Sequence, residues 1–189
     1  MMRYLNYLLL AAMLGALQGC FPVVAAGVGA GALMASDRRT SGAYIEDESI
    51  EDKALSQINN KYHDTVHVNV TSFNRHVLLT GEVPNDAAKT GVEKIVAAIP
   101  NVKVINNELV ISGLSGLASR SSDTFITSDV KLRFLNNKNF RATDIKVVTE
   151  NGVVFLMGMV YRKEPAVATD IASTTSGVQR VVKVFEYLD

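Results

Sequence analysis

The chain contains two copies of one pattern of apolar residues, and this repeat restricts the fold more than any other feature. Residues 76–83 and 153–160 are both apolar runs with one central glycine, Gly81 or Gly158. Each run follows a turn, and an alternating run of Val or Ile precedes that turn, as expected for a hairpin. The second turn contains Asn151-Gly152, and both residue types tolerate positive φ. The sequence therefore predicts a β-hairpin in each copy.

A helix precedes each hairpin, and a helix and a strand follow it. After the first hairpin, apolar residues at helical spacing predict a helix with Asp86 as its cap and Pro100 as its stop. In the second copy, Pro165 is placed in the first turn of the matching helix. The opening helices are expected near 50–62 and 126–137, and the closing strands within 101–109 and 177–185. The order αββαβ, found twice, predicts an α+β fold of two sandwiches, with helices packed on one face of a small mixed sheet.

The N-terminal part has almost no charge, since Arg3 is the only charged residue before Asp37. An apolar run over residues 5–17 follows Arg3 and ends in Leu17-Gln18-Gly19-Cys20, which contains the only Cys of the chain. This segment resembles a bacterial lipoprotein signal, with Gln18 in place of the usual small residue. The resemblance implies cleavage before Cys20, with a diacylglycerol thioether and an N-acyl lipid such as palmitate on Cys20.

Two alternatives to lipidation stay open at this point. One is a buried or incidental cysteine, and the other is an uncleaved helix that continues to residue 35, which Pro22 and several glycines disfavour. Phe21 follows Cys20, whereas Asp at that place would retain such a lipoprotein in the inner membrane, so the resemblance implies an outer-membrane location. The expected organisation is a signal peptide (1–19), a lipidated tether (20–44), a first domain (45–110), a linker (111–122) and a second domain (123–189).

The repeat resembles the BON domain, whose pattern has a glycine at the end of the second strand and a closing strand of the form Gly-Val-x-x-Val-x-Asn-x-Leu. In the second copy, the matching residues are Gly177, Val178, Val181 and Phe185, with Lys183 in place of Asn. In the first copy, they are Val102, Ile105, Asn107 and Leu109, with Asn101 in place of Gly. Together with the lipidation signal, the chain is similar to the DolP-like family of dual-BON outer-membrane lipoproteins.

The resemblance implies a non-enzymatic protein that faces the periplasm. It also implies binding of anionic phospholipid through the second domain and support of envelope integrity. The alternative is a structural module that docks on an outer-membrane assembly or cell-division protein. A nucleic-acid partner of the histone type is excluded by the balanced charge of 19 basic and 19 acidic residues.

Catalysis and metal binding find little support in the sequence. The chain has no nucleophile elbow, no helical metalloprotease motif and no Walker loop. His63 and His67 are four residues apart, but an expected turn between them keeps them off one helix face. The acidic residues between 46 and 52 are expected at a helix N-terminus, where they would complement the helix dipole. We therefore expect no catalytic residue, no metal site, no cofactor and no small-molecule substrate.

The two copies can be compared position by position along their opening helices. With a shift of 76 residues, Ile50, Ala54 and Ile58 correspond to Ile126, Val130 and Phe134, a shared apolar stripe that predicts the core face. The second copy has three more apolar residues, Phe125, Leu132 and Leu135, where the first copy has Ser49, Ser56 and Asn59. A core position would be apolar in both copies. We therefore expect this second stripe to be exposed and to have a function.

The charges of the two copies also differ. Residues 45–110 carry six basic and ten acidic residues, net −4, whereas residues 124–189 carry nine and seven, net +2. Lys131, Arg133 and Lys138 lie on or beside the helix with the second stripe. Apolar residues flanked by cations predict a surface for anionic phospholipid membranes. Packing of the stripe against the first domain and binding of another partner are the alternatives.

Overall fold

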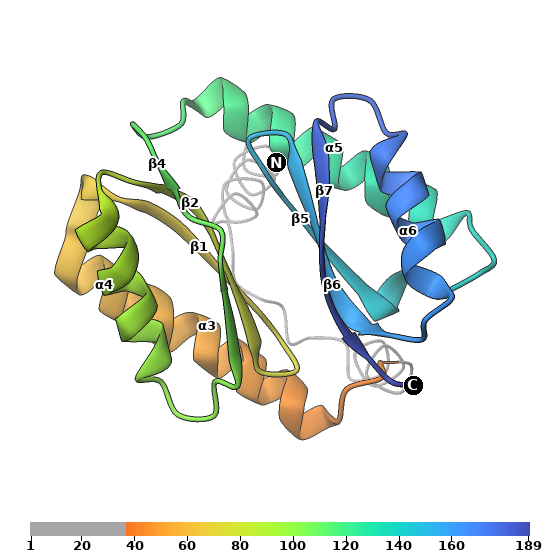
Figure 1. Ribbon diagram of the computed structural model, residues 1–189, viewed down its shortest axis with the longest axis horizontal. Coiled ribbons are helices and arrows are strands. Elements are labelled where there is room, and N and C mark those ends of the chain that lie inside the picture. The colour runs from red at the N-terminus through yellow and green to blue at the C-terminus, as the bar shows by residue number, and fades with distance from the viewer. Residues whose placement is uncertain (1–36) are drawn as a thin grey trace, which may run out of the picture. The chain divides into compact units, whose positions relative to one another are not determined.

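The first copy folds as a helix, a β-hairpin, a second helix and closing strands (Figure 1). Its elements are α3 (Ser41–Tyr62), the short η1 (His63–Thr65), β1 (His67–Phe73), β2 (His76–Val83), α4 (Asp86–Ala97), β3 (Val104–Asn107) and β4 (Val110–Ile111). β1 is antiparallel to β2, while β3 and β4 both pair with β2 in parallel. The sheet is therefore mixed, as the sequence predicts.

The second copy repeats this order. Its elements are α5 (Leu117–Leu135), the short η2 (Ala142–Asp144), β5 (Ile145–Glu150), β6 (Val153–Val160), α6 (Glu164–Ser173) and β7 (Arg180–Tyr187). β6 pairs antiparallel with β5 and parallel with β7. The predicted α+β fold of two αββαβ sandwiches is confirmed.

This computed structural model describes residues 37–189, which belong to one compact unit. The expected signal peptide, Cys20 and most of the expected tether lie outside the described residues.

Both opening helices begin earlier than expected. α3 starts at Ser41, capped by Thr40, whose Oγ1 accepts a hydrogen bond from the Ala43 amide at 3.1 Å. Residues 41–44, expected in the tether, are therefore helical, and so are residues 117–122 of the expected linker, because α5 starts at Leu117. The apolar residues recur at helical spacing only from Ile50 and Ile126 onward. Extending a helix that has already formed costs little free energy, so each helix gains polar turns before its apolar stripe begins. The cap of α4 is also one residue earlier, at Asn85 rather than Asp86.

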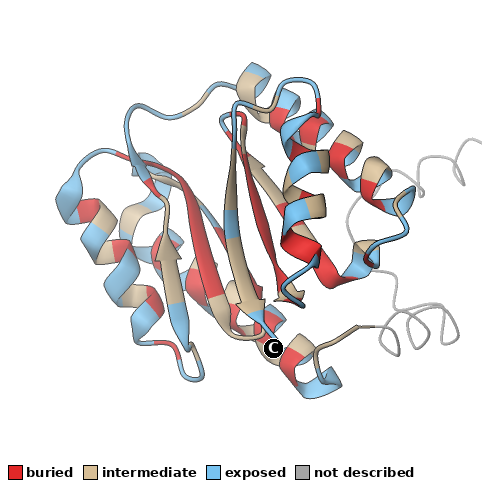
Figure 2. Cartoon of the chain, turned by 45° about the vertical axis from the view of Figure 1, so that its right-hand side comes forward, coloured by how far each residue is buried: buried red, intermediate tan, exposed pale blue. Residues whose placement is uncertain are grey.

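Each helical layer covers the outer face of its own sheet. The predicted core stripes are confirmed, since Ile50, Ala54 and Ile58 are buried in the first copy and Ile126, Val130 and Phe134 in the second. The first set packs with the apolar side chains of β2 and α4, and the second with those of β6 and α6. Figure 2 shows the buried segments along the central strands and on the inner faces of the helices.

The other faces of the two sheets pack against each other. Phe73 and Leu78 of the first sheet form one buried cluster with Phe155 and Met157 of the second. Polar contacts at the margin join the same two copies, such as Lys146 Nζ to Glu51 Oε1 at 2.9 Å. The two BON-like copies therefore form a four-layered body, with helices outside and two sheets inside (Figure 1).

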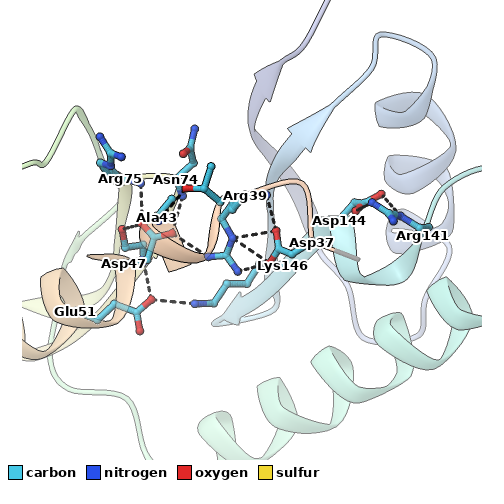
Figure 3. A network of polar contacts seen from close by, with 12 residues as sticks. Asp37, Arg39, Ala43, Asp47, Glu51, Asn74, Arg75, Arg141, Asp144 and Lys146 are labelled. Carbon is cyan, nitrogen blue, oxygen red and sulfur yellow. Dashed lines mark hydrogen bonds and ion pairs between the residues drawn. The ribbon is translucent and has the colours of Figure 1, made fainter. Parts of the chain in front are cut away.

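The acidic residues near the start of α3 do not lie in its first turn, so that expectation was wrong. Asp47 is buried and accepts hydrogen bonds from the backbone amides of Asn74 and Arg75 at 2.8 and 2.7 Å (Figure 3). It also accepts one from Ser72 Oγ at 2.6 Å. Asn74 and Arg75 form the turn between β1 and β2, and both have positive φ. Their amides both point at the Asp47 carboxylate, so Asp47 holds this hairpin turn.

Candidate functional site

The outer face of α5 carries three large apolar side chains that are open to solvent. Phe125, Leu132 and Leu135 are 73%, 59% and 68% exposed, while the core residues of the same helix face the sheet. Phe125 and Leu132 are seven residues apart, about two helical turns, so they lie on one face. The alternative in which these side chains pack against the first domain is wrong, because none of them is buried.

Leu117 belongs to the same face and was missed in the sequence, where it lies in the expected linker. It is 84% exposed and stands eighteen residues before Leu135, which corresponds to five helical turns. α5 has 19 residues and is therefore about 28 Å long. We call Leu117, Phe125, Leu132 and Leu135 the α5 stripe.

The three basic residues predicted beside the stripe differ in their exposure and in their hydrogen bonds. Lys131 and Lys138 are exposed, and neither forms an ion pair within residues 37–189. Arg133 is partly buried, and its Nη1 donates to the Ile171 carbonyl oxygen at 2.8 Å while Nη2 donates to Thr174 Oγ1 at 2.9 Å. Arg133 thus ties α5 to the C-terminal end of α6.

The segment before α3 joins the two domains. Arg38 Nη1 donates to Glu164 Oε2 and to the Met159 carbonyl oxygen, both at 2.7 Å, and Arg38 Nη2 lies 3.0 Å from Asp144 Oδ2. The Arg38 guanidinium holds the pKa of Glu164 below its ordinary value of 4.5. The next residue, Arg39, pairs with Asp47 of the first domain at 2.9 Å (Figure 3).

Arg38 also lies near the end of the α5 stripe. A surface hollow of about 570 Å³ is lined by Arg38 together with Leu135, Lys138 and Phe140. The chain therefore enters the described body beside the C-terminal end of α5. An anchor at the far end of the preceding segment would be connected to the body at this point.

A second polar site lies where the two sheets meet. His67 Nδ1 is 2.9 Å from Glu82 Oε2 and 4.0 Å from Glu150 Oε1. Burial favours a higher pKa for Glu82, but hydrogen bonds from Asn151 and His67 outweigh it, so the pKa of Glu82 lies below its ordinary value. Burial raises the pKa of Glu150 above its ordinary value.

Two repeated αββαβ units, each with a mixed sheet and outer helices, define a tandem α+β repeat protein. Within residues 37–189, none of the helices combines the length and the apolar character needed to cross a membrane. A family model of the BON domain matches residues 46–113 and 122–189. The chain belongs to the BON domain family.

Curated relatives extend this likeness over nearly the whole chain. The chain is 40% identical over 185 residues to "Outer membrane lipoprotein DolP" of Haemophilus influenzae, covering 95% of this chain and 96% of the relative. It is 31% identical over 154 residues to "21 kDa hemolysin" of Actinobacillus pleuropneumoniae, covering 80% and 79%. Neither name denotes an enzyme. The chain is thus a DolP-like dual-BON lipoprotein, lipid-anchored in the outer membrane.

The likeness to one solved structure is weak. The C-terminal domain of CdsD, a structural protein of the type III secretion system of Chlamydia trachomatis, has a TM-score of 0.31 and 12% identity. The match covers 72% of this chain and 96% of that one. A score at this level carries no argument about function.

Proposed function

We propose that this lipoprotein, anchored through Cys20 and facing the periplasm, binds anionic phospholipid with the α5 stripe. In this proposal it acts without catalysis and supports the integrity of the envelope. The observation that carries the proposal is the exposure of large apolar side chains on α5, where the first copy has Ser49, Ser56 and Asn59. Both helices use the same core positions, so the difference between them concerns only the outer face.

The chemistry of this face suits the surface of an anionic bilayer. Burying a Leu or Phe side chain contributes about 1.5–3 kcal/mol, and a Lys near an anionic surface contributes about 1 kcal/mol. Lys131 and Lys138 lie on or just beyond α5, and both are exposed. Apolar side chains can enter the headgroup region while these ammonium groups stay near the phosphates.

The anchor adds to this binding by keeping the helix near the membrane. Eighteen residues separate Cys20 from Arg38, a contour length of at most about 65 Å. Arg38 fixes the chain beside Leu135, so the stripe and the entry point of the tether share one end of α5. A tethered weak site acts at a high effective concentration, so modest affinity is sufficient.

Vesicle co-sedimentation tests the proposal. Residues 37–189 would be purified so that Arg38 and Arg39 are retained, and mixed with vesicles of phosphatidylcholine with or without phosphatidylglycerol. We expect binding to the anionic vesicles only, and at least a tenfold loss in the Phe125→Ser, Leu135→Ser double variant. Binding should also fall with added salt, since exposed charges are screened within about 8 Å at physiological ionic strength.

Ile45→Ser is the matched control for this experiment. Ile45 is 64% exposed on α3, so its replacement removes an equally open apolar side chain from the first domain. It should leave vesicle binding unchanged. Undiminished binding by the folded double variant would refute the assignment of the stripe, and no binding to any vesicle would favour docking on a protein partner.

A further inference from the structure

The side chains of His67, Glu82 and Glu150 meet at the junction of the two BON domains. His67 and Glu82 come from the paired strands β1 and β2 of the first domain, and Glu150 ends β5 of the second. One donor atom from each residue lies within 4.8 Å of the other two. Zinc bonds of about 2.0–2.2 Å at tetrahedral angles place donor atoms roughly 3.3–3.6 Å apart. The distances from His67 Nδ1 to the two carboxylates, 2.9 and 4.0 Å, bracket this value.

The two carboxylates of this cluster are buried and share a single imidazole. Glu82 is 1% exposed and Glu150 is 7% exposed. Asn69 donates a hydrogen bond to Glu150 Oε2 at 2.8 Å, whereas within residues 37–189 Glu150 Oε1 has no hydrogen-bond donor and lies 4.0 Å from His67 Nδ1. Two carboxylates this close repel each other when both are charged, and a bound cation would offset that repulsion.

Neighbouring amides orient the cluster. Asn151 Nδ2 donates to Glu82 Oε1 at 2.6 Å, and the Ser115 amide donates to Glu82 Oε2 at 3.3 Å, the oxygen that also faces His67 Nδ1. Outer donors of this kind hold carboxylate ligands in place at metal sites. His67 and Glu150 also line a cavity of about 410 Å³ beside α5, which offers an entry path and room for a water ligand.

We propose that His67, Glu82 and Glu150 bind one Zn²⁺ ion that links the two BON domains. One imidazole nitrogen and two carboxylates form a nitrogen and oxygen donor set that suits zinc, whereas Mg²⁺ and Ca²⁺ prefer oxygen ligands alone. Two ligands belong to the first domain and one to the second, so the ion stabilises the domain pair. This site is separate from the α5 stripe and does not depend on the lipid proposal.

Zinc titration of the full chain tests this inference. The protein would be purified in detergent without a histidine tag, stripped with a chelator and titrated with ZnCl₂ by calorimetry. We expect one Zn²⁺ per chain, no binding of Mg²⁺ or Ca²⁺, and a rise in melting temperature of about 5–10 °C at a 100-fold excess over Kd. His67→Asn and Glu150→Gln should each weaken zinc binding at least tenfold.

His76→Asn is the matched control. His76 Nε2 lies 3.8 Å from Glu186 Oε2, so this pair also joins the two domains, but with one carboxylate only. Its replacement should leave zinc affinity unchanged. Absence of zinc binding, or binding that survives both cluster variants, would overturn the proposal.

X-ray absorption of the zinc-loaded wild-type protein gives an answer that does not need the variants to fold. The expected shell has one imidazole nitrogen and otherwise oxygen. A spectrum with sulfur, or with two or more imidazoles, would exclude the site.

Discussion

At the scale of single residues, a buried aspartate in each opening helix holds the hairpin turn that follows. Asp123 accepts hydrogen bonds from the amides of Asn151 and Gly152 at 2.9 and 2.8 Å, as Asp47 does for the first turn. Asn151 and Gly152 both have positive φ, which matches the predicted two-residue turn. The same contact occurs in both copies, so these two acids hold the hairpin turns of the fold.

Gly158 gives a sharp prediction at this scale. A Cβ at Gly158 would lie 2.3 Å from the Asp144 carbonyl oxygen, and at Gly81 it would lie 2.1 Å from the His67 carbonyl oxygen. A close approach of the neighbouring backbone therefore excludes a side chain at both positions. Gly158→Val should therefore lower the free energy of unfolding by roughly 2–4 kcal/mol, measured by urea denaturation.

Gly113→Ala serves as the control for Gly158→Val. A Cβ at Gly113 would meet nothing within 4 Å, so its effect should stay within about ±0.5 kcal/mol. Equal stability of Gly158→Val and wild type would contradict the packing described for the β5–β6 hairpin.

At the scale of elements, α5 combines two faces with different tasks. Its inner face has Ile126, Val130 and Phe134 in the core, and Phe134 also meets Phe140 edge to face at 5.0 Å between ring centroids. Its outer face carries the α5 stripe. Between these faces, Arg133 connects α5 to α6, which separates its role from that of Lys131.

Arg133 and Lys131 should respond differently to replacement by alanine. Arg133→Ala removes a cation that bonds to the last turn of α6, where a positive charge is favourable, and should destabilise the protein by about 1–3 kcal/mol. Lys131→Ala should change stability little but weaken vesicle binding severalfold. Urea denaturation and co-sedimentation on both variants check this, and a reversed pattern would assign the lipid contact to Arg133 instead.

At the scale of the whole molecule, Arg38 and Arg39 join the domains through different acids. Arg38 pairs with Glu164 and Asp144 of the second domain, and Arg39 pairs with Asp47 of the first. A short segment before the first helix therefore reinforces the packing of the two sheets. Because Arg38 lowers the pKa of Glu164 in the folded state, the contribution of the Arg38–Glu164 pair to stability depends on pH.

The direction in which stability changes with pH follows from the lowered pKa of Glu164. Arg38 lowers the pKa of Glu164 from 4.5, so the folded state favours the charged form. The resulting stability is present above about pH 4.5 and is lost as pH falls from there through the folded pKa. Glu164→Gln should cost roughly 1–3 kcal/mol at pH 7, and its difference from wild type should shrink below pH 4.5.

Urea denaturation between pH 7 and pH 3 measures this difference. Glu48→Gln, at an exposed site on α3, is the control and should follow wild type throughout. A difference between Glu164→Gln and wild type that stays constant with pH would contradict the role of this pair.

Local patterns in the chain determined the two αββαβ units, their mixed sheets and the residues of their cores. Apolar residues recur at helical spacing from Ile50 and from Ile126, and Asn151-Gly152 is typical of a two-residue hairpin turn. Short stretches of sequence are therefore enough to predict these helices and this turn. Comparison of the copies also predicted the exposure of Phe125, Leu132 and Leu135.

Only the tertiary structure decided how the two copies pack and which polar groups meet between them. His67 lies 15 residues from Glu82 and 83 residues from Glu150, and Arg38 lies 126 residues from Glu164. The spacing of apolar residues predicts which face of a helix or strand is buried, but it does not predict which elements pack against each other. The contacts of Arg133 and the cluster at the domain junction depend on the packing of helix on helix and sheet on sheet, which no short stretch of sequence encodes.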